Sequence, residues 1–162
     1  WEEELEGKPP ANTTSKDAWC YGVPGIARTL FLAGKALGDD ALKTFAANAF
    51  RGVFSRTQKE WGLLGPTLCH GISGLLLLTH KMSNEEGCED LAAKVEELKN
   101  ILLSFYSSDA PWGFRDVETS RKGAHPEINK PGFLEGTAGI ILTLFSLSHG
   151  LSKWDLPLLI HE

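Results

Sequence analysis

The chain has 162 residues, of which 42% are apolar and 23% are charged, with 17 Gly and 8 Pro. This composition is typical of a globular protein, and it excludes a collagen-like repeat, a disordered tail and a disulfide-dense mini-scaffold. The net charge is −5 and no basic tract is present, so nucleic acid is a poor candidate partner. The length predicts a single domain over residues 1–162 that buries a substantial core.

Three further features bear on where the protein works. No apolar run approaches the roughly 18–20 residues that span a bilayer, and residues 1–9 are acidic, without the apolar core of a signal peptide. The three cysteines, Cys20, Cys69 and Cys88, are odd in number and widely spaced, so a reducing cytoplasm fits better than a disulfide framework. Because the chain begins without Met in a polar linker, residues 1–15, we expect a piece of a longer protein.

The hydrophobic pattern predicts an all-α fold in which two kinds of helix alternate. Helices that are apolar on nearly every side must be buried on every face, whereas amphipathic helices keep one face in water. In chain order the predicted helices are 25–37 (apolar), 40–54 (amphipathic), 72–79 (apolar), 88–105 (amphipathic) and 139–147 (apolar).

Local signals separate these helices. Gly38 predicts the end of the first helix, and Asp39 or Asp40 caps the second. Strand-type alternation is scarce, and the loop 107–133 is the one place where the pattern allows a short hairpin.

An internal repeat organises the chain. The segments Cys20–Ile26, Cys69–Leu75 and Leu134–Ile140 align without gaps, and each is a G-x-x-G turn that opens an apolar helix. We therefore predict helical repeats over residues 16–162, with apolar helices inside and amphipathic helices outside. Three helical hairpins are too few to close a ring, so the chain is either an open array or part of a larger toroid.

The repeat places candidate metal ligands at one mouth. If the three turns superpose, Cys20 and Cys69 are equivalent, His70 is adjacent, and Tyr21 and Glu135 are its counterparts in the other turns. Two Cys and one His are good zinc ligands, and three protein ligands leave a fourth position open, as in catalytic zinc sites. The alternative interpretation is that each cysteine is simply a small buried hydrophobe.

The remaining histidines and tryptophans carry weaker signals. His80 and His149 are placed near helix ends, where they would cap carbonyls, and His125 lies in the long loop before the third turn, where it is a candidate for the mouth. Four tryptophans are candidates either for a peptide-binding surface or for the core: Trp19, Trp61, Trp112 and Trp154.

The motifs also resemble those of a known family. The segments Trp19–Gly22, Cys69–Gly71 and Gly132–Gly139 are similar to the signature motifs of the lanthionine synthetase C-like (LanC) cyclases, and the resemblance runs from about Asp17 to the last helix. It implies an α/α toroid of inner and outer helices, a central Zn²⁺ ion, and closure of thioether rings in lantibiotic precursor peptides.

The resemblance also implies roles for individual residues. Cys20, Cys69 and His70 correspond to the three zinc ligands, and Tyr21 corresponds to a residue that lines the active site. Lys16 stands where the family commonly has Arg, so a cation is retained but bidentate contact is lost. The family's toroid is more than twice as long and its catalytic His and Asp lie upstream, so this chain corresponds to the C-terminal half and needs the upstream half.

The implied reaction is the addition of a peptide cysteine thiolate to dehydroalanine or dehydrobutyrine in a dehydrated precursor peptide, followed by protonation of the enolate. Expected partners are this peptide and the dehydratase and transporter of a biosynthetic complex, through which a cytoplasmic enzyme would associate peripherally with the membrane. Two alternatives stay open. One is a non-catalytic, zinc-dependent module that binds glutathione or a peptide, as eukaryotic LanC-like relatives suggest, and the other is a metal-free helical interaction scaffold.

Overall fold

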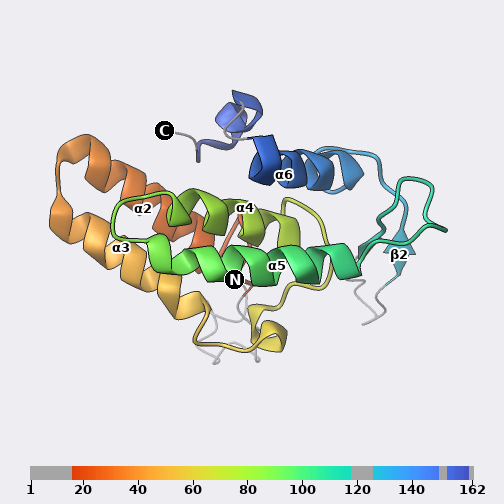
Figure 1. Ribbon diagram of the computed structural model, residues 1–162, viewed down its shortest axis with the longest axis horizontal. Coiled ribbons are helices and arrows are strands. Elements are labelled where there is room, and N and C mark those ends of the chain that lie inside the picture. Colours follow the sequence, from red (N-terminus) through yellow and green to blue (C-terminus); the bar gives the residue numbers. More distant parts are fainter. Residues whose placement is uncertain (1–15, 118–125, 150–152, 161–162) are drawn as a thin grey trace, which may run out of the picture.

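The computed structural model describes residues 16–117, 126–149 and 153–160, which form a mostly helical chain (Figure 1). All five predicted helices are present, although the fourth is divided into a short 3-10 helix and an α-helix. In chain order the elements are α2 (Val23–Leu37), α3 (Asp40–Val53), η1 (Gln58–Trp61), α4 (Ile72–Ser83), η2 (Glu89–Leu91), α5 (Ala92–Ser104), β1 (Asp116–Val117), β2 (Glu127–Ile128), α6 (Thr137–His149) and η3 (Lys153–Leu158).

The two strands form the short hairpin allowed by the loop pattern. They pair antiparallel, with Asp116 opposite Ile128 and Val117 opposite Glu127. The predicted linker, residues 1–15, and the candidate His125 lie outside the described residues. Within the described ranges, no helix combines the length and the apolar character that crossing a bilayer requires.

The turn between α2 and α3 forms as its residues predict. Gly38 adopts a left-handed conformation, with φ of 66°, and its N–H bonds back to the carbonyls at the end of α2. Asp39 then caps α3, because its side chain accepts a hydrogen bond of 2.9 Å from the backbone N–H of Leu42. The chain therefore reverses direction between the two helices within two residues.

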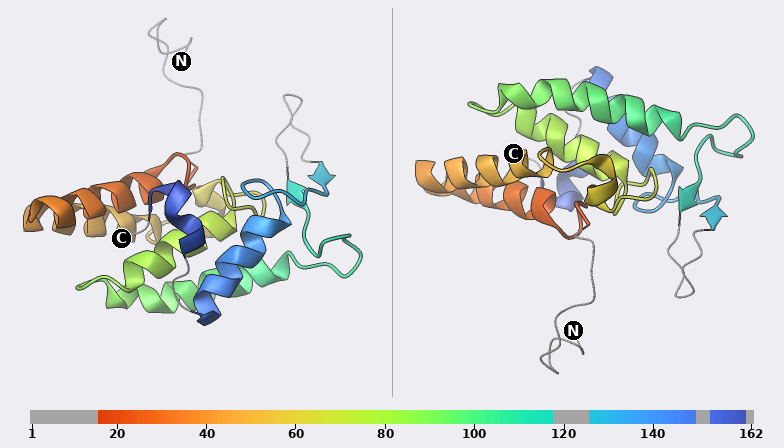
Figure 2. Two further views of the ribbon diagram at one scale, coloured as in Figure 1. Left: turned by 90° about the horizontal axis from the view of Figure 1, so that it is seen from above. Right: turned by 90° about the horizontal axis from the view of Figure 1, so that it is seen from below.

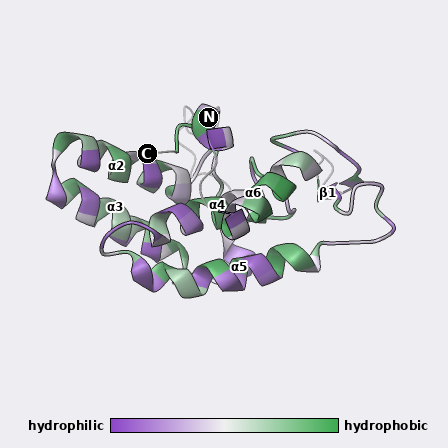
Figure 3. Cartoon of the chain, turned by 45° about the horizontal axis from the view of Figure 1, so that its top comes forward, coloured by the Kyte–Doolittle hydropathy of each residue, from purple (hydrophilic) through white to green (hydrophobic). Residues whose placement is uncertain are grey.

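The helices are arranged in two layers of an arc. The inner layer consists of α2, α4 and α6, and α3 and α5 pack on its outer side (Figure 1). The central helix, α4, contacts α2, α5 and α6, and within it only His80 and Ser83 are not buried. The outer helices alternate hydrophilic and hydrophobic residues, as expected of amphipathic helices (Figure 3).

The prediction that apolar helices are buried on every face is right for α4 and wrong for α2 and α6. Ile26 of α2 is 59% exposed, and Ile141 and Phe145 of α6 are 54% and 47% exposed. The reason is position, since α4 has an inner helix on both sides whereas α2 and α6 are the two edges of the arc. No helix in the described part of the chain covers their outer edges.

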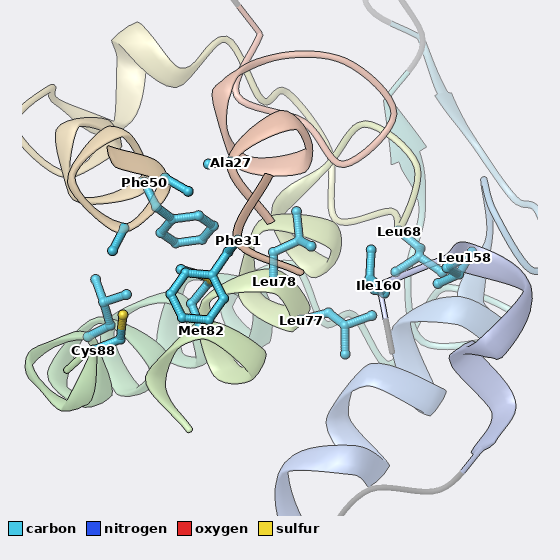
Figure 4. Packing of buried hydrophobic residues seen from close by; sticks show 13 residues of the cluster. Ala27, Phe31, Phe50, Leu68, Leu77, Leu78, Met82, Cys88, Leu158 and Ile160 are labelled. Carbon is cyan, nitrogen blue, oxygen red and sulfur yellow. The ribbon is translucent and has the colours of Figure 1, made fainter. Parts of the chain in front are cut away.

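The core fills the space between the layers. In the larger cluster Phe31, Phe50, Leu78 and Met82 pack together with the buried Cys88 (Figure 4). A second cluster joins the inner face of α5 to α4 and α6. Fully burying one such side chain contributes roughly 1.5–3 kcal/mol, so these clusters stabilise the two layers against each other.

A third layer, not expected from the sequence, is made by η3 and the residues that follow it. Seen from above, η3 lies over α4, between α2 and α6 (Figure 2). It is joined to α4 by a buried ion pair between Lys81 and Asp155, and to α6 by a hydrogen bond of 2.8 Å from Trp154 to Ser146. This segment covers the inner face of the arc, the face turned away from α3 and α5.

Buried charges also hold the end of the helices that lies away from the G-x-x-G turns. The Arg28 guanidinium, 1% exposed, lies 2.6 Å from one carboxylate oxygen of Glu85, and Lys35 lies 2.8 Å from the other. Arg28 also donates a hydrogen bond of 3.2 Å to the carbonyl of Ile160. These contacts tie α2 to the turn after α4 and to the C-terminal segment.

Candidate functional site

The three G-x-x-G turns fold back on the chain in the same way. A Cβ atom on Gly25, Gly74 or Gly139 would lie 2.0–2.1 Å from the carbonyl oxygen of the residue six positions earlier. The first glycine of each turn makes the same approach to its own sixth preceding carbonyl, at 2.0–2.4 Å. Side chains cannot come so near, so glycine is required at both positions, and each inner helix begins tightly against its own entry loop.

Backbone hydrogen bonds then join the three turns in series. The N–H of Cys20 bonds to the carbonyl of Cys69 at 3.3 Å, and the N–H of Cys69 bonds to the carbonyl of Leu134 at 2.8 Å. These three residues are the ones that the repeat alignment made equivalent. The predicted superposition of the turns is therefore correct, and the turns form one mouth at the same end of the inner helices.

The two candidate sulfur ligands meet at this mouth. The backbone hydrogen bond places Cys20 and Cys69 side by side, with Cys20 exposed and Cys69 half-buried. Burial, reinforced by the Cys20 thiol, raises the pKa of Cys69 to about 12. The interpretation of a cysteine as a small buried hydrophobe describes only Cys88, which is 1% exposed in the core.

A hollow of about 240 Å³ lies beside the thiols, and we call it the polar hollow. Tyr21, His70 and Glu135, the counterparts in the three turns, all line it together with Lys16. The ammonium of Lys16 lies 6.0 Å from the centre of the Tyr21 ring, within cation–π range. The candidates Lys16 and Tyr21 are therefore next to each other and next to His70.

Lys130, which the sequence analysis missed, also lines the polar hollow. Its ammonium lies 3.1 Å from the fully buried carboxylate of Asp116, on β1, and 3.2 Å from that of Glu135. A signal was present in the sequence, because Lys130 precedes Gly136 by the same six positions by which Lys16 precedes Gly22. Two of the three repeats thus bring a lysine to the same hollow.

The other histidines and tryptophans lie away from the thiols or serve the fold. His149 lies in the last turn of α6, where its ring stacks on Phe145, and His80 lies in the last turn of α4, as predicted. Trp61 is buried, with its indole N–H bonded to the carbonyl of Val53 at 3.0 Å. Of the tryptophans, Trp19 is the one that lies directly beside Cys20 in sequence and lines a cavity with it.

A larger cavity, of about 780 Å³, lies at the opposite end of the molecule from the thiols. Most of its charged side chains are already paired with one another or with neighbours, such as Lys35 with Glu85 and Lys43 with Asp40 at 2.6 Å. The size of a cavity alone therefore does not locate the chemistry of this protein.

The donor atoms at the mouth are of the types that bind zinc. Thiolate sulfur and imidazole nitrogen are the ligands that zinc prefers, and here two cysteines lie side by side while the neighbouring residue supplies an imidazole. No group of three Cys, His, Asp or Glu side chains in the described ranges is arranged around a common point for a metal ion. The two sulfurs are thus together, whereas His70 faces the adjacent polar hollow.

The fold is an arc of paired helices, and cysteines lie at the ends of its inner helices. The comparisons with known proteins name the class of protein that has these features. The sequence matches the lanthionine synthetase C-like protein family over residues 1–159, and the chain belongs to this family. It is 28% identical over 152 residues to the nisin biosynthesis protein NisC of Lactococcus lactis subsp. lactis, covering 91% of this chain and 31% of that protein.

The structure resembles that of a nisin cyclase, with a TM-score of 0.69 and 24% sequence identity, over 98% of this chain and 35% of that one. This likeness confirms the predicted fold, an α/α toroid of which the chain forms a part. The chain spans about a third of the length of the curated relative that it matches.

Proposed function

We propose that this chain carries the zinc-binding mouth of a lanthionine cyclase, an enzyme that joins peptide cysteines to dehydroalanine or dehydrobutyrine through thioether bonds. The observation that carries the proposal is the backbone hydrogen bond that brings Cys20 and Cys69 side by side at a mouth built from three equivalent turns. Membership of the lanthionine synthetase C-like family supports it.

In this proposal Cys20, Cys69 and His70 hold one Zn²⁺ ion and leave a fourth position for the peptide. A bound zinc ion would lower the pKa of the peptide thiol, so that the thiolate is available at neutral pH. The exposed position of Cys20 leaves the mouth open to a peptide from solvent.

Tyr21 and Lys16 are proposed to act on the acceptor side of the reaction. As the sulfur–carbon bond forms, negative charge develops on the carbonyl oxygen of the dehydroamino acid. The Tyr21 phenol, 52% exposed in the polar hollow, can donate a hydrogen bond to this oxygen, and the ammonium of Lys16 beside the ring adds positive charge. The proton that completes the addition would come from an acid in the upstream half of the toroid.

The proposed reaction also implies partners for this chain. The substrate would be a dehydrated precursor peptide, and a dehydratase and a transporter would be further members of the complex. The exposed apolar residues of α6, Ile141 and Phe145, lie at an edge of the arc where further helices of a closed toroid would pack. We propose that the upstream half of the cyclase covers this edge.

Metal analysis tests the proposed ligands. The metal-free chain is dialysed against a zinc salt and then against zinc-free buffer to remove unbound zinc. It should retain one zinc ion, measured by elemental mass spectrometry. Cys69→Ser should abolish retention, whereas Cys88→Ser should retain the ion, because Cys88 is buried in the core away from the mouth. Equal zinc retention by Cys69→Ser and the unmodified chain would contradict the assignment.

Ring closure needs the complete protein that contains this chain, supplied with a peptide carrying one dehydroalanine and one cysteine. The addition does not change the mass of the peptide, so closure is measured as loss of the thiol that an alkylating reagent can label. The alternative, a zinc-dependent module that binds glutathione or a peptide, predicts tight binding of the thiol peptide without loss of the label. Retention of neither zinc nor peptide would favour the metal-free scaffold.

A further inference from the structure

A second hollow begins at Cys20 and runs along the inner face of α2. It has a volume of about 480 Å³, and we call it the apolar groove. One wall is formed by Trp19 and by Ile26 and Leu30 of α2, and the other by Leu158, Leu159 and Ile160. Cys20 and Tyr21 line it as well, so the apolar groove and the polar hollow adjoin at Tyr21.

The wall made by the C-terminal segment is held firmly in place. The buried Lys81–Asp155 ion pair and the Trp154–Ser146 hydrogen bond fix its beginning, and the bond from Arg28 to the carbonyl of Ile160 fixes its end. Leu158 and Ile160 point into the core beside Leu77 (Figure 4). The groove wall is therefore part of the folded structure, even though it lies near the end of the described chain.

Leu159, between these two anchors, has an unusual conformation. Its φ is 56°, a left-handed value that is uncommon for a residue other than glycine, and its side chain is 82% exposed. Leu159 is the sole non-glycine residue with positive φ among the described residues. The strained backbone thus presents a large apolar side chain to solvent at the rim of the groove.

The chemistry of the groove favours an apolar occupant. Among the described residues that line it there is no charged side chain. Of its two hydroxyls, that of Thr29 already donates to the carbonyl of Gly25 at 3.0 Å, and the other belongs to Tyr21, which also lines the polar hollow. A charged side chain placed there would lose water without gaining a partner, whereas an apolar one would be buried against leucine and isoleucine. The lysines and carboxylates of the mouth lie instead in the polar hollow.

We propose that the apolar groove is a subsite for an apolar side chain of the peptide, at the residue next to the reacting cysteine. This rests on the proposed function, because Cys20 then marks where the peptide sulfur is held. Neighbouring Cα atoms in a peptide are 3.8 Å apart, so the residue beside that cysteine stays close to the mouth where Cys20 lies. The groove begins at Cys20, and is the apolar surface that this residue would meet.

Four pentapeptides test the proposal on the complete, zinc-loaded protein. They are identical except at the central residue, Cys or Ser, and at the two residues that flank it, which are both Leu or both Ser. Their dissociation constants are measured by calorimetry. With Cys at the centre, the peptide with flanking Leu should bind about tenfold more tightly than the peptide with flanking Ser, because an apolar side chain is removed from water. A ratio near one would overturn the subsite.

Variants of the groove sharpen the test. Leu159→Asn replaces the apolar side chain at the rim with that of a residue that tolerates the left-handed conformation. Ile26→Ser removes the apolar side chain of the opposite wall. Each should reduce the preference for Leu to about twofold. The matched control is Leu103→Ser, a residue of α5 that is 46% exposed and far from the groove, and it should keep the full preference. Equal loss of preference in Leu103→Ser would contradict the proposal.

The peptides with central Ser separate this proposal from the proposed function. If zinc does not hold the peptide sulfur, Cys and Ser peptides bind alike while the preference for Leu persists, and only the proposed function fails. If Cys is favoured but Leu is not, only the subsite fails. A second copy of the protein as the occupant would appear as a dimer in sedimentation that Leu159→Asn dissociates, and this result would also overturn the peptide subsite.

Discussion

The two ends of the inner helices are held together by different means. At the mouth, the turns are joined by backbone hydrogen bonds, as between Cys20 and Cys69, and each turn is tightened by glycines packed on its own carbonyls, as at Gly74. At the far end, buried side-chain charges make the connections, with Arg28 and Glu85 at their centre. Backbone contacts at the mouth leave its side chains available for chemistry, whereas the far end commits its side chains to the fold.

The cysteines illustrate the same difference. Cys20 and Cys69 lie at the mouth, joined by a backbone hydrogen bond, and Cys20 is exposed and lines the apolar groove. Cys88 lies at the far end, where burial raises the pKa of its thiol and removes it from solvent. The same residue type therefore serves the candidate site at one end and the core at the other.

The largest expected effect is at the far end. Glu85→Ala would leave the buried Arg28 guanidinium without its counter-charge, and breaking a buried pair in this way costs about 3–5 kcal/mol. Urea unfolding measures this loss. The matched control is Glu97→Ala, which removes a surface pair with Lys94 and should cost less than about 1 kcal/mol. Similar losses in the two variants would show that the far end does not depend on its buried charges.

A somewhat smaller effect is expected at the mouth. Gly74→Ala places a Cβ 2.1 Å from the carbonyl oxygen of Leu68, so the backbone must shift, at a cost of about 3 kcal/mol in unfolding free energy. In Gly52→Ala, within α3, the added Cβ meets no atom within 4 Å, and the variant should be stabilised by about 0.5–1 kcal/mol. If both substitutions stabilise the protein, close backbone packing does not define the mouth.

The smallest effect concerns pH at the far end. Burial and the charge of Lys81 lower the pKa of His80 from the ordinary 6.5, so the folded state binds this proton less readily than the unfolded state. The unfolding free energy should therefore fall as pH decreases below 6.5, until the lower pKa of the folded state is passed.

Urea unfolding at about pH 7.5 and about pH 5.5 measures this difference, which His80→Gln should reduce. The control is His149→Gln, at the exposed end of α6, which should leave the difference between the two pH values as it is in the unmodified chain. An undiminished difference in His80→Gln would place the pH dependence elsewhere.

Much of the fold was accessible from local patterns. The helix boundaries follow from hydrophobic periodicity and from residues such as Gly38 and Asp39, whose effect on the backbone is local. The repeat alignment further predicted that Cys20 and Cys69 would meet, because glycine spacing forces each turn into the same shape. Lys130 was missed, although it precedes Gly136 by the same six positions by which Lys16 precedes Gly22, because both lysines lie outside the aligned segments.

The amino-acid sequence by itself determined the helices, their alternation between layers and the common shape of the three turns, since periodicity and glycine act over a few residues. Only the tertiary structure decided which apolar faces are covered and that a C-terminal segment lies across the inner helices. Those features depend on pairs such as Lys81 with Asp155 and Arg28 with Ile160, which are far apart in sequence and are brought together by packing. The apolar groove at Cys20 exists because of that packing.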